Sequence, residues 1–178
     1  MKFEVVSKYK NAGIALPERK TAQSAGYDIA CAQDIVIPPM WDHLHNIENK
    51  SEKGMVYTLD EMAKLTKTLK AKPTLVPTGI KCKLDKRCYL ELSVRSSSPL
   101  KYWLVLANGV GIIDADYYNN PDNEGELFFQ LINMTTQPIQ LKKGDIIGQG
   151  IIKPYYTTDD DYAYGKRLGG FGSTSENE

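Results

Sequence analysis

The chain has 178 residues, long enough for one domain with a buried core, and its 22 basic and 22 acidic residues give a formal net charge of zero. This balance argues against a binding surface for nucleic acids or anionic membranes. Every apolar run falls short of the roughly 18 residues of a membrane span, and the N-terminal sequence lacks the apolar core of a signal peptide. We therefore expect a cytoplasmic protein with no nucleic-acid and no membrane partner.

The cysteines and histidines do not follow a metal-binding pattern. Cys31, Cys82 and Cys88 lack the CxxC spacing, and their odd number favours free thiols in a reducing compartment. His43 and His45 lie two residues apart with no third ligand nearby, so a metal site there is the less favoured interpretation.

The first forty residues predict short strands separated by turns. In the sequence AGYDIA, at Ala25–Ala30, glycine lets the backbone approach another group closely. Asp28 in this sequence either caps local amides in a turn or serves a function. The apolar run Ile35–Ile37 predicts a strand that ends at two prolines.

Residues 41–72 differ in pattern from the rest of the chain. Thr58 and Glu61 have the spacing of a capping box, and the apolar residues that follow fall on one helical face. This pattern predicts a single amphipathic helix over Leu59–Lys70. The helix either packs on the outside of the domain or forms a surface that binds a partner protein.

Two strand regions, Thr74–Leu84 and Cys88–Val94, follow this segment. The second region leads directly into Arg95 and the serines from Ser96 to Ser98. A guanidinium group followed by hydroxyls suits phosphate oxygens, because the guanidinium donates hydrogen bonds in a fork and hydroxyls add further donors. Taken alone, the same pattern more often forms a polar turn.

The centre of the chain is the sequence LVLANGVGIIDADYY, at Leu104–Tyr118. Asn108-Gly109 between two apolar runs predicts a tight hairpin in which both turn residues adopt positive φ. The second run ends at Asp114, and tyrosines follow it. A purely structural hairpin needs no such polar groups at its exit, although an ordinary surface hairpin remains the alternative.

The rest of the chain predicts three strands, at Gly125–Met134, Pro138–Leu141 and Ile146–Ile152. Gln149 in the last of them is either an edge amide or a phosphate ligand. The polar and acidic residues 155–165 predict a linker. The glycine-rich tail is by default a disordered terminus, but its amides could surround anionic oxygens and its one phenylalanine could stack on a base.

Five motifs in this order resemble those of the trimeric dUTPases, which split dUTP into dUMP and pyrophosphate. They are AGYDIA at Ala25–Ala30, RSSS at Arg95–Ser98, GIIDADY at Gly111–Tyr117, GDIIGQ at Gly144–Gln149 and GGFGSTS at Gly169–Ser175. The motifs extend over nearly the whole chain except residues 41–72, which look like an insertion. In that family the reaction limits the incorporation of uracil into DNA and supplies dUMP for dTMP synthesis.

Many short strands with regular turn signals predict an all-β sandwich or barrel. The resemblance implies a jelly-roll-like β-barrel subunit, carrying the one inserted helix, in a homotrimer. It also implies that residues 1–165 form the β domain and that residues 166–178 form a C-terminal arm. In this arrangement the arm of one subunit closes over an active site that two other subunits build.

The resemblance further implies the roles of individual residues. Asp114 would orient and deprotonate the attacking water as general base. Mg²⁺, the implied cofactor, would be carried by the triphosphate and would contact Asp28 through water only. Tyr117 would pack on the deoxyribose and leave no room for a 2′-hydroxyl. The residues implied in binding dUTP are Arg95, Ser96, Ser97, Asn108, Gly111, Ile112, Ile113, Tyr117, Gln149, Lys166, Arg167, Phe171, Gly172, Ser173 and Thr174.

The tail departs from the family pattern at one position. The motif's arginine usually stands five residues before the phenylalanine, where this chain has Lys166, and Arg167 is one residue closer. Either residue could therefore pair with the γ-phosphate.

Two other functions are compatible with parts of the sequence. The dCTP deaminases share the fold and an RSS motif, but they shuttle protons with a glutamate where this chain has Gln130, and an amide cannot do this. A nucleotide-sensing protein that binds a partner through residues 41–72 is the other alternative, and it need not exclude catalysis.

Overall fold

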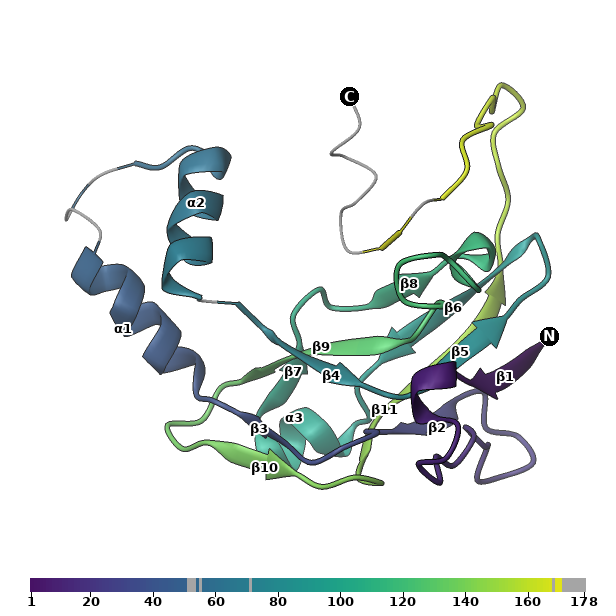
Figure 1. Cartoon of the computed structure of the whole chain (residues 1–178), viewed down its shortest axis with the longest axis horizontal. Coiled ribbons are helices and arrows are strands. Elements are labelled where there is room, and N and C mark those ends of the chain that lie inside the picture. The colour runs from purple at the N-terminus through teal and green to yellow at the C-terminus, as the bar shows by residue number, and fades with distance from the viewer. Residues whose placement is uncertain (51–53, 55, 71, 168, 171–178) are drawn as a thin grey trace.

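The computed structural model describes residues 1–50, 54, 56–70, 72–167 and 169–170. Eleven strands dominate this part of the chain, and two helices stand beside them (Figure 1). The predicted all-β class is therefore confirmed. None of the helices in the described residues is both long and apolar enough to cross a membrane.

All paired strands run antiparallel and form four ladders. The largest ladder has the order β2 (Tyr27–Ala30), β11 (Ile146–Pro154), β6 (Cys88–Ser93) and β8 (Gly111–Ile113). A second ladder joins β4 (Thr74–Pro77), β9 (Phe128–Asn133) and β7 (Leu104–Leu106). Two further pairs are β1 (Lys2–Val5) with β5 (Ile80–Lys83), and β3 (Ile35–Ile37) with β10 (Ile139–Leu141).

One hydrophobic core joins these ladders. Phe129 of β9, Ile29 of β2 and Leu90 of β6 are among its fully buried members. Gly148 of β11 lets β9 come this close, because a Cβ there would lie 2.6 Å from both the ring carbon Cζ of Phe129 and the carbonyl oxygen of Ser93. Closely packed side chains of different ladders therefore fix how the strands that carry the candidate site lie.

The predicted strands and thiols agree with the structure, with one refinement. The region predicted at Thr74–Leu84 is two strands, β4 and β5, because Gly79 adopts a φ of +68° between them. The three cysteines are free, as predicted. Burial raises the pKa of the Cys31 thiol and raises that of Cys82 to about 12, so both stay protonated at neutral pH.

The prediction of a single inserted helix is wrong, because residues 41–72 contribute to two. The predicted one is confirmed as α2 (Leu59–Leu69), which begins with the full capping box of Thr58 and Glu61. The other is α1 (Met40–Lys50), which follows the two prolines that were expected only to end a strand. One face of α1, with an i, i+3, i+4, i+7 spacing, lines a hollow together with residues of β4 and β9; its residues there are Met40, His43, Leu44 and Ile47.

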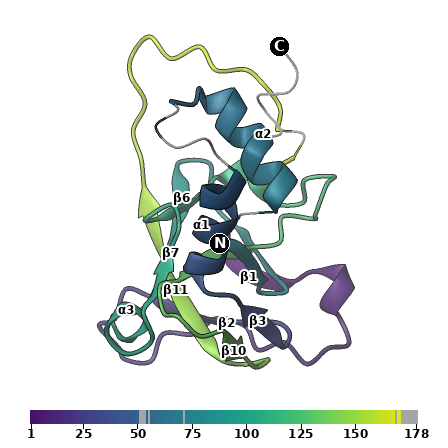
Figure 2. The same ribbon diagram turned by 90° about the vertical axis from the view of Figure 1, so that its left-hand side faces the viewer.

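The two helices lie beside the strands rather than among them. Figure 2 views the molecule from the helix side and shows α1 and α2 in front of the strand body. No residue of α2 is buried, and Leu59 at its start is 90% exposed. The protein partner predicted for residues 41–72 stays a prediction.

A third helix, α3 (Ser97–Tyr102), replaces the polar turn expected after β6. Pro99 occupies its first turn, where proline is tolerated because the first N–H groups of a helix have no intrahelical partner. Trp103 ends the helix with a φ of +53° and leads into β7.

The buried carboxylate of Glu126 generates a prediction about stability. Its side chain accepts a hydrogen bond from the N–H of Gly79 at 3.1 Å, and burial raises its pKa. The folded state therefore disfavours the ionised form, so the wild-type chain gains stability as pH falls through the raised pKa toward the unfolded value of about 4.3. Glu126→Gln keeps an acceptor for Gly79 without the charge. We expect this variant to melt above the wild-type chain at pH 8, by a margin that shrinks at pH 5.

Asp122→Asn is the matched control, because it removes one negative charge from an exposed loop residue. Its melting temperature relative to wild type should change little between the two pH values. A Glu126→Gln variant that melts below wild type at pH 8 would contradict the prediction.

Candidate active site

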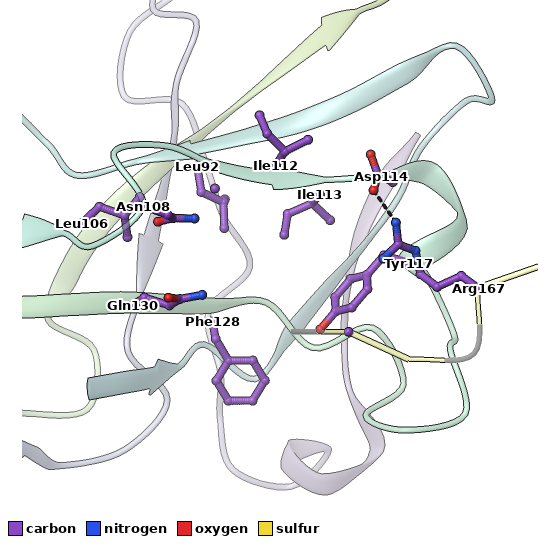
Figure 3. Close-up of a pocket in the computed structure, with 12 residues that line it drawn as sticks. Leu92, Leu106, Asn108, Ile112, Ile113, Asp114, Tyr117, Phe128, Gln130 and Arg167 are labelled. Carbon is purple, nitrogen blue, oxygen red and sulfur yellow. Dashed lines mark hydrogen bonds and ion pairs between the residues drawn. The ribbon is translucent and has the colours of Figure 1, made fainter. Parts of the chain in front are cut away.

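A pocket of about 150 Å³ lies between β7, β8 and β9. Figure 3 shows Asn108 and Gln130 at one end of it, and Asp114, Tyr117 and Arg167 gathered at the other. The residues that line the pocket are Leu92, Leu106, Asn108, Gly111, Ile112, Ile113, Asp114, Tyr117, Phe128, Gln130, Arg167 and Gly170.

The pocket exists because β7 and β8 separate instead of pairing. β7 pairs with β9 and β8 pairs with β6, so the predicted hairpin between them is wrong. The turn itself is tight, since the N–H of Gly109 donates to the carbonyl of Leu106 at 3.0 Å, but only Gly109 has positive φ. A turn with two positive-φ residues would match the twist of two paired strands, and this one directs its strands into different ladders.

Asp114 immediately follows β8 and is 51% exposed at its side chain. The guanidinium of Arg167 pairs with Asp114 and also donates to Asp116, the latter at 2.8 Å. Lys166 is exposed, so of the two basic residues in the tail it is Arg167 that reaches this pocket. The carboxylate proposed to activate water is thus bound to a residue of the chain's own C-terminal segment.

Tyr117 forms a wall of the pocket from a short 3₁₀ helix, Ala115–Tyr117. Its side chain is buried, and this burial raises the pKa of its hydroxyl. Gly170 lies against the ring, where a Cβ would come within 2.7 Å of the ring carbon Cε2. The guanidinium carbon of Arg167 lies 5.9 Å from the ring centroid.

A second polar cluster lies on the other side of β6. Gln149 of β11 pairs in register with Ser93 on one side and with Asp28 of β2 on the other. The Asp28 side chain is 10% exposed, and its Oδ2 lies 3.5 Å from Nη1 of Arg95. This oxygen has no hydrogen-bond partner in the described part of the chain, which is unusual for a buried carboxylate.

The sequence-predicted residues therefore fall into two groups. The pocket brings together Asp114, Tyr117, Arg167, Asn108, Gly111, Ile112 and Ile113. Around the end of β6 lie Asp28, Arg95, Ser96, Ser97 and Gln149. Arg95 and Ser97 line a separate hollow. Phe171, Gly172, Ser173 and Thr174 lie outside the described residues.

Several pocket residues were not predicted. Leu92, Leu106 and Phe128 read as ordinary strand residues, and nothing in their local sequence distinguishes them from the core. The sequence did give a reason to place Gly170 at the site, because this residue lies within the glycine-rich motif at Gly169–Ser175.

Whether the described residues could accept a metal ion depends mainly on Asp28. Among the described residues there is no group of three or more His, Cys, Asp or Glu side chains that could hold a metal ion. A single buried carboxylate oxygen without a hydrogen-bond partner fits a metal that brings its own ligands, because that oxygen can accept a hydrogen bond from metal-bound water.

Comparison with known proteins decides the family. The family model for dUTPase matches residues 42–174. A deoxyuridine 5′-triphosphate nucleotidohydrolase of Lactococcus lactis subsp. lactis (strain IL1403) is 41% identical over 174 residues, which are 97% of this chain and 95% of the relative. The chain belongs to the dUTPase family.

Solved structures of dUTPases agree with this assignment. The crystal structure of a Streptococcus mutans dUTPase is similar with a TM-score of 0.68 and 35% identity, covering 89% of this chain and 99% of that one. The dUTPase from phage phi11 of S. aureus has a TM-score of 0.61 over 92% of this chain and 96% of its own. At 18% identity, this second likeness concerns the fold alone. The family resemblance deduced from five motifs is confirmed, while the roles of the single residues stay predictions.

Proposed function

We propose that this chain hydrolyses dUTP at the α-phosphorus and releases dUMP and pyrophosphate. The observation that carries the proposal is the pocket beside β8, with a carboxylate at its end, in a chain of the dUTPase family. Hydrolysis of dUTP would limit uracil incorporation into DNA and would supply dUMP for dTMP synthesis.

The pocket has features suited to a pyrimidine base. Backbone N–H and C=O groups from Asn108 to Ile113 border it and offer fixed donors and acceptors for the edge of uracil. The close approach of Gly111 to Leu92, where a Cβ would lie 3.2 Å from the Cβ of Leu92, keeps this wall rigid. Rigid walls exclude the methyl group of thymine sterically, and fixed backbone groups mispair with cytosine. The amide of Gln130 lines the same pocket, and it cannot act as the proton shuttle of a deaminase.

Tyr117 and Asp114 would act on the sugar and the reacting phosphate. The flat ring of Tyr117 would pack under the deoxyribose and leave no space for a 2′-hydroxyl. Asp114, exposed at the end of β8, would orient the attacking water and accept its proton. When a triphosphate binds, Arg167 can exchange its contact with Asp114 for phosphate oxygens, which frees the carboxylate.

The triphosphate would be held by groups on several elements. We assign this role to Arg95, Ser96 and Ser97 after β6, to Gln149 of β11, and to the tail. Lys166 adds charge at the surface, and Phe171, Gly172, Ser173 and Thr174 complete the arm that closes over the nucleotide.

Two separated clusters in one chain support a composite active site. The pocket and the Arg95 cluster flank β6 and line different hollows of the same subunit. A homotrimer would bring the pocket of one subunit to the phosphate-binding cluster of another. For this assembly we assign residues 1–165 to the β domain and residues 166–178 to the arm.

Mg²⁺ is the cofactor that the residues present would accept. When bound, it would neutralise part of the triphosphate charge. The buried Asp28 Oδ2 would accept a hydrogen bond from a water molecule of the hydrated ion, and Arg95, whose Nη1 lies 3.5 Å from this oxygen, would help to orient the carboxylate.

The direct test is incubation of the purified protein with each deoxynucleoside triphosphate and Mg²⁺, with pyrophosphate release as the readout. Release from dUTP, far above that from dCTP or dTTP, is the expected result. Ammonia release from dCTP would support the deaminase instead. Equal turnover of every substrate would contradict recognition of uracil by the pocket.

Asp114→Asn should bind dUTP but lose most turnover. The amide preserves the size of the side chain and one acceptor, but it cannot take a proton from water. Loss of a general base lowers kcat by roughly 10²- to 10⁴-fold. The measurement is kcat from pyrophosphate release, with dUTP affinity from calorimetry as the control for folding. Near-normal turnover would remove Asp114 from the mechanism.

Arg167→Met and Lys166→Met form a matched pair that tests which basic residue meets the triphosphate. Each variant removes one positive charge, but only Arg167 reaches the pocket. A charge-assisted hydrogen bond contributes roughly 1.5–3 kcal/mol, so Arg167→Met should lower kcat/KM for dUTP by about 10- to 100-fold. Lys166→Met should lower it less than threefold or so, as for a screened surface charge. The reverse order would assign the γ-phosphate contact to Lys166.

A further inference from the structure

The loop after Tyr117 contains a compact turn that the proposed mechanism does not use. We refer to residues 118–126 as the asparagine turn. Within it, Asn120 Nδ2 donates to the carbonyl of Tyr117 at 3.0 Å, and Asn120 Oδ1 accepts from the N–H groups of Asp122 and Asn123. These side-chain amides add to backbone hydrogen bonds within the same segment, such as the one from the N–H of Glu124 to the carbonyl of Asn120 at 3.0 Å.

Asn123 joins this turn to the wall of the pocket. Its Oδ1 accepts hydrogen bonds from the N–H of Gly125 at 3.0 Å and from Asn120 Nδ2 at 2.8 Å. These two bonds fix the orientation of the amide, and its Nδ2 then donates to the hydroxyl oxygen of Tyr117 at 2.7 Å. The same hydroxyl donates to the carbonyl of Glu126 at 3.1 Å. The Tyr117 hydroxyl is therefore held both as a hydrogen-bond donor and as an acceptor.

The other side of the turn is attached to the strand body. Lys81 of β5 is buried, and its ammonium group donates to Asn119 Oδ1 and to Glu124 Oε1, both at 2.6 Å. The second oxygen of Glu124 accepts from the N–H of Ser7 at 2.9 Å. The turn is thus fixed to the β1–β5 ladder, and a fixed turn can hold the Tyr117 ring against displacement by a ligand.

The turn also lies too close to Tyr117 to shift as a unit. Gly125 has a φ of +80°, and a Cβ at this position would lie 2.6 Å from the carbonyl oxygen of Tyr117. Asn119 and Glu124 also adopt positive φ, a backbone arrangement that persists only where surrounding contacts determine it. In this turn, the hydrogen bonds of Lys81 and of the asparagines hold the backbone in that arrangement.

We infer that Asn123 is a positioning residue for sugar selection: it fixes the Tyr117 ring at the depth where the ring excludes a 2′-hydroxyl. The inference rests on the proposed hydrolysis of dUTP and deepens it. A ring free to tilt away from the pocket would make room for a ribose. Asn123 contacts Tyr117 and not the pocket, so it acts through the ring alone.

The test is a double-mutant cycle of Asn123→Ala and Tyr117→Phe, read as the ratio of kcat/KM for dUTP to that for UTP. Asn123→Ala should lower this ratio by roughly 3- to 10-fold, the equivalent of one hydrogen bond. Tyr117→Phe keeps the ring but removes the hydroxyl, so it should lower the ratio at least as much. In the Tyr117→Phe background, Asn123→Ala should change the ratio no further.

Asp122→Ala is the matched control, because its side chain is exposed in the same turn. It should leave the ratio at the wild-type value. A drop in the ratio that is equal in both backgrounds of the cycle would assign Asn123 to general stability of the turn and overturn the inference. A wild-type ratio in Tyr117→Phe would overturn it as well, and this variant keeps Asn123 and the turn intact if Asn123→Ala does not fold.

A structural measurement separates this inference from the proposed function. In a ligand-free crystal structure of Asn123→Ala, the Tyr117 ring should be displaced or occupy two positions, while in Asp122→Ala it should remain in place. An undisplaced ring would overturn the inference, whatever the substrate. Failure of the wild-type protein to release pyrophosphate from dUTP would overturn the proposed function, while the ring position would still decide the role of Asn123.

Discussion

The candidate site depends on hydrogen bonding along both edges of β6. One edge pairs with β8 and places Gly111 opposite Leu92, which forms the floor of the pocket. The other edge pairs with β11 and places Gln149 opposite Ser93, next to Asp28. Because side chains along a strand repeat every two residues, a shift of β6 by one residue would turn both groups away from their positions at once. A single strand register therefore couples the pocket beside β8 to the polar cluster around Arg95 and Asp28.

Sequence patterns predicted the features that are local and missed those that need partners distant in the chain. The capping box of Thr58 and Glu61 predicted α2 correctly, because every interaction in it lies within four residues. The hairpin predicted from Asn108-Gly109 was wrong for the opposite reason. The local chemistry of this turn suits a hairpin, but β7 gains its hydrogen bonds from β9, whose residues lie more than twenty positions away. Strand pairing is decided by the whole core, and local propensity does not report it.

The same distinction applies to the site. Asp114, Tyr117 and Asn108 could be named from one short motif, and the structure does bring them to one pocket. Phe128 could not be named, because a phenylalanine in an apolar strand predicts only a core. The contact of Lys81 with Asn119 and the contact of Asn123 with Tyr117 could not be predicted either. These contacts join residues 38 and 6 positions apart through an irregular loop. Spacing alone does not predict such contacts, because the loop has no helical or strand period.

The strength of the Arg167 contact decides whether it obstructs the site. Both carboxylates that it meets are more than half exposed, and ion pairs at such positions contribute only about 0–1 kcal/mol because water screens them. Without the cation, Asp114 and Asp116 would place two negative charges at the end of one pocket. The contact is therefore strong enough to relieve this repulsion but weak enough to be exchanged for a triphosphate, whose higher charge attracts the guanidinium more strongly. In the proposed mechanism, substrate binding itself would release Asp114 for its role with water.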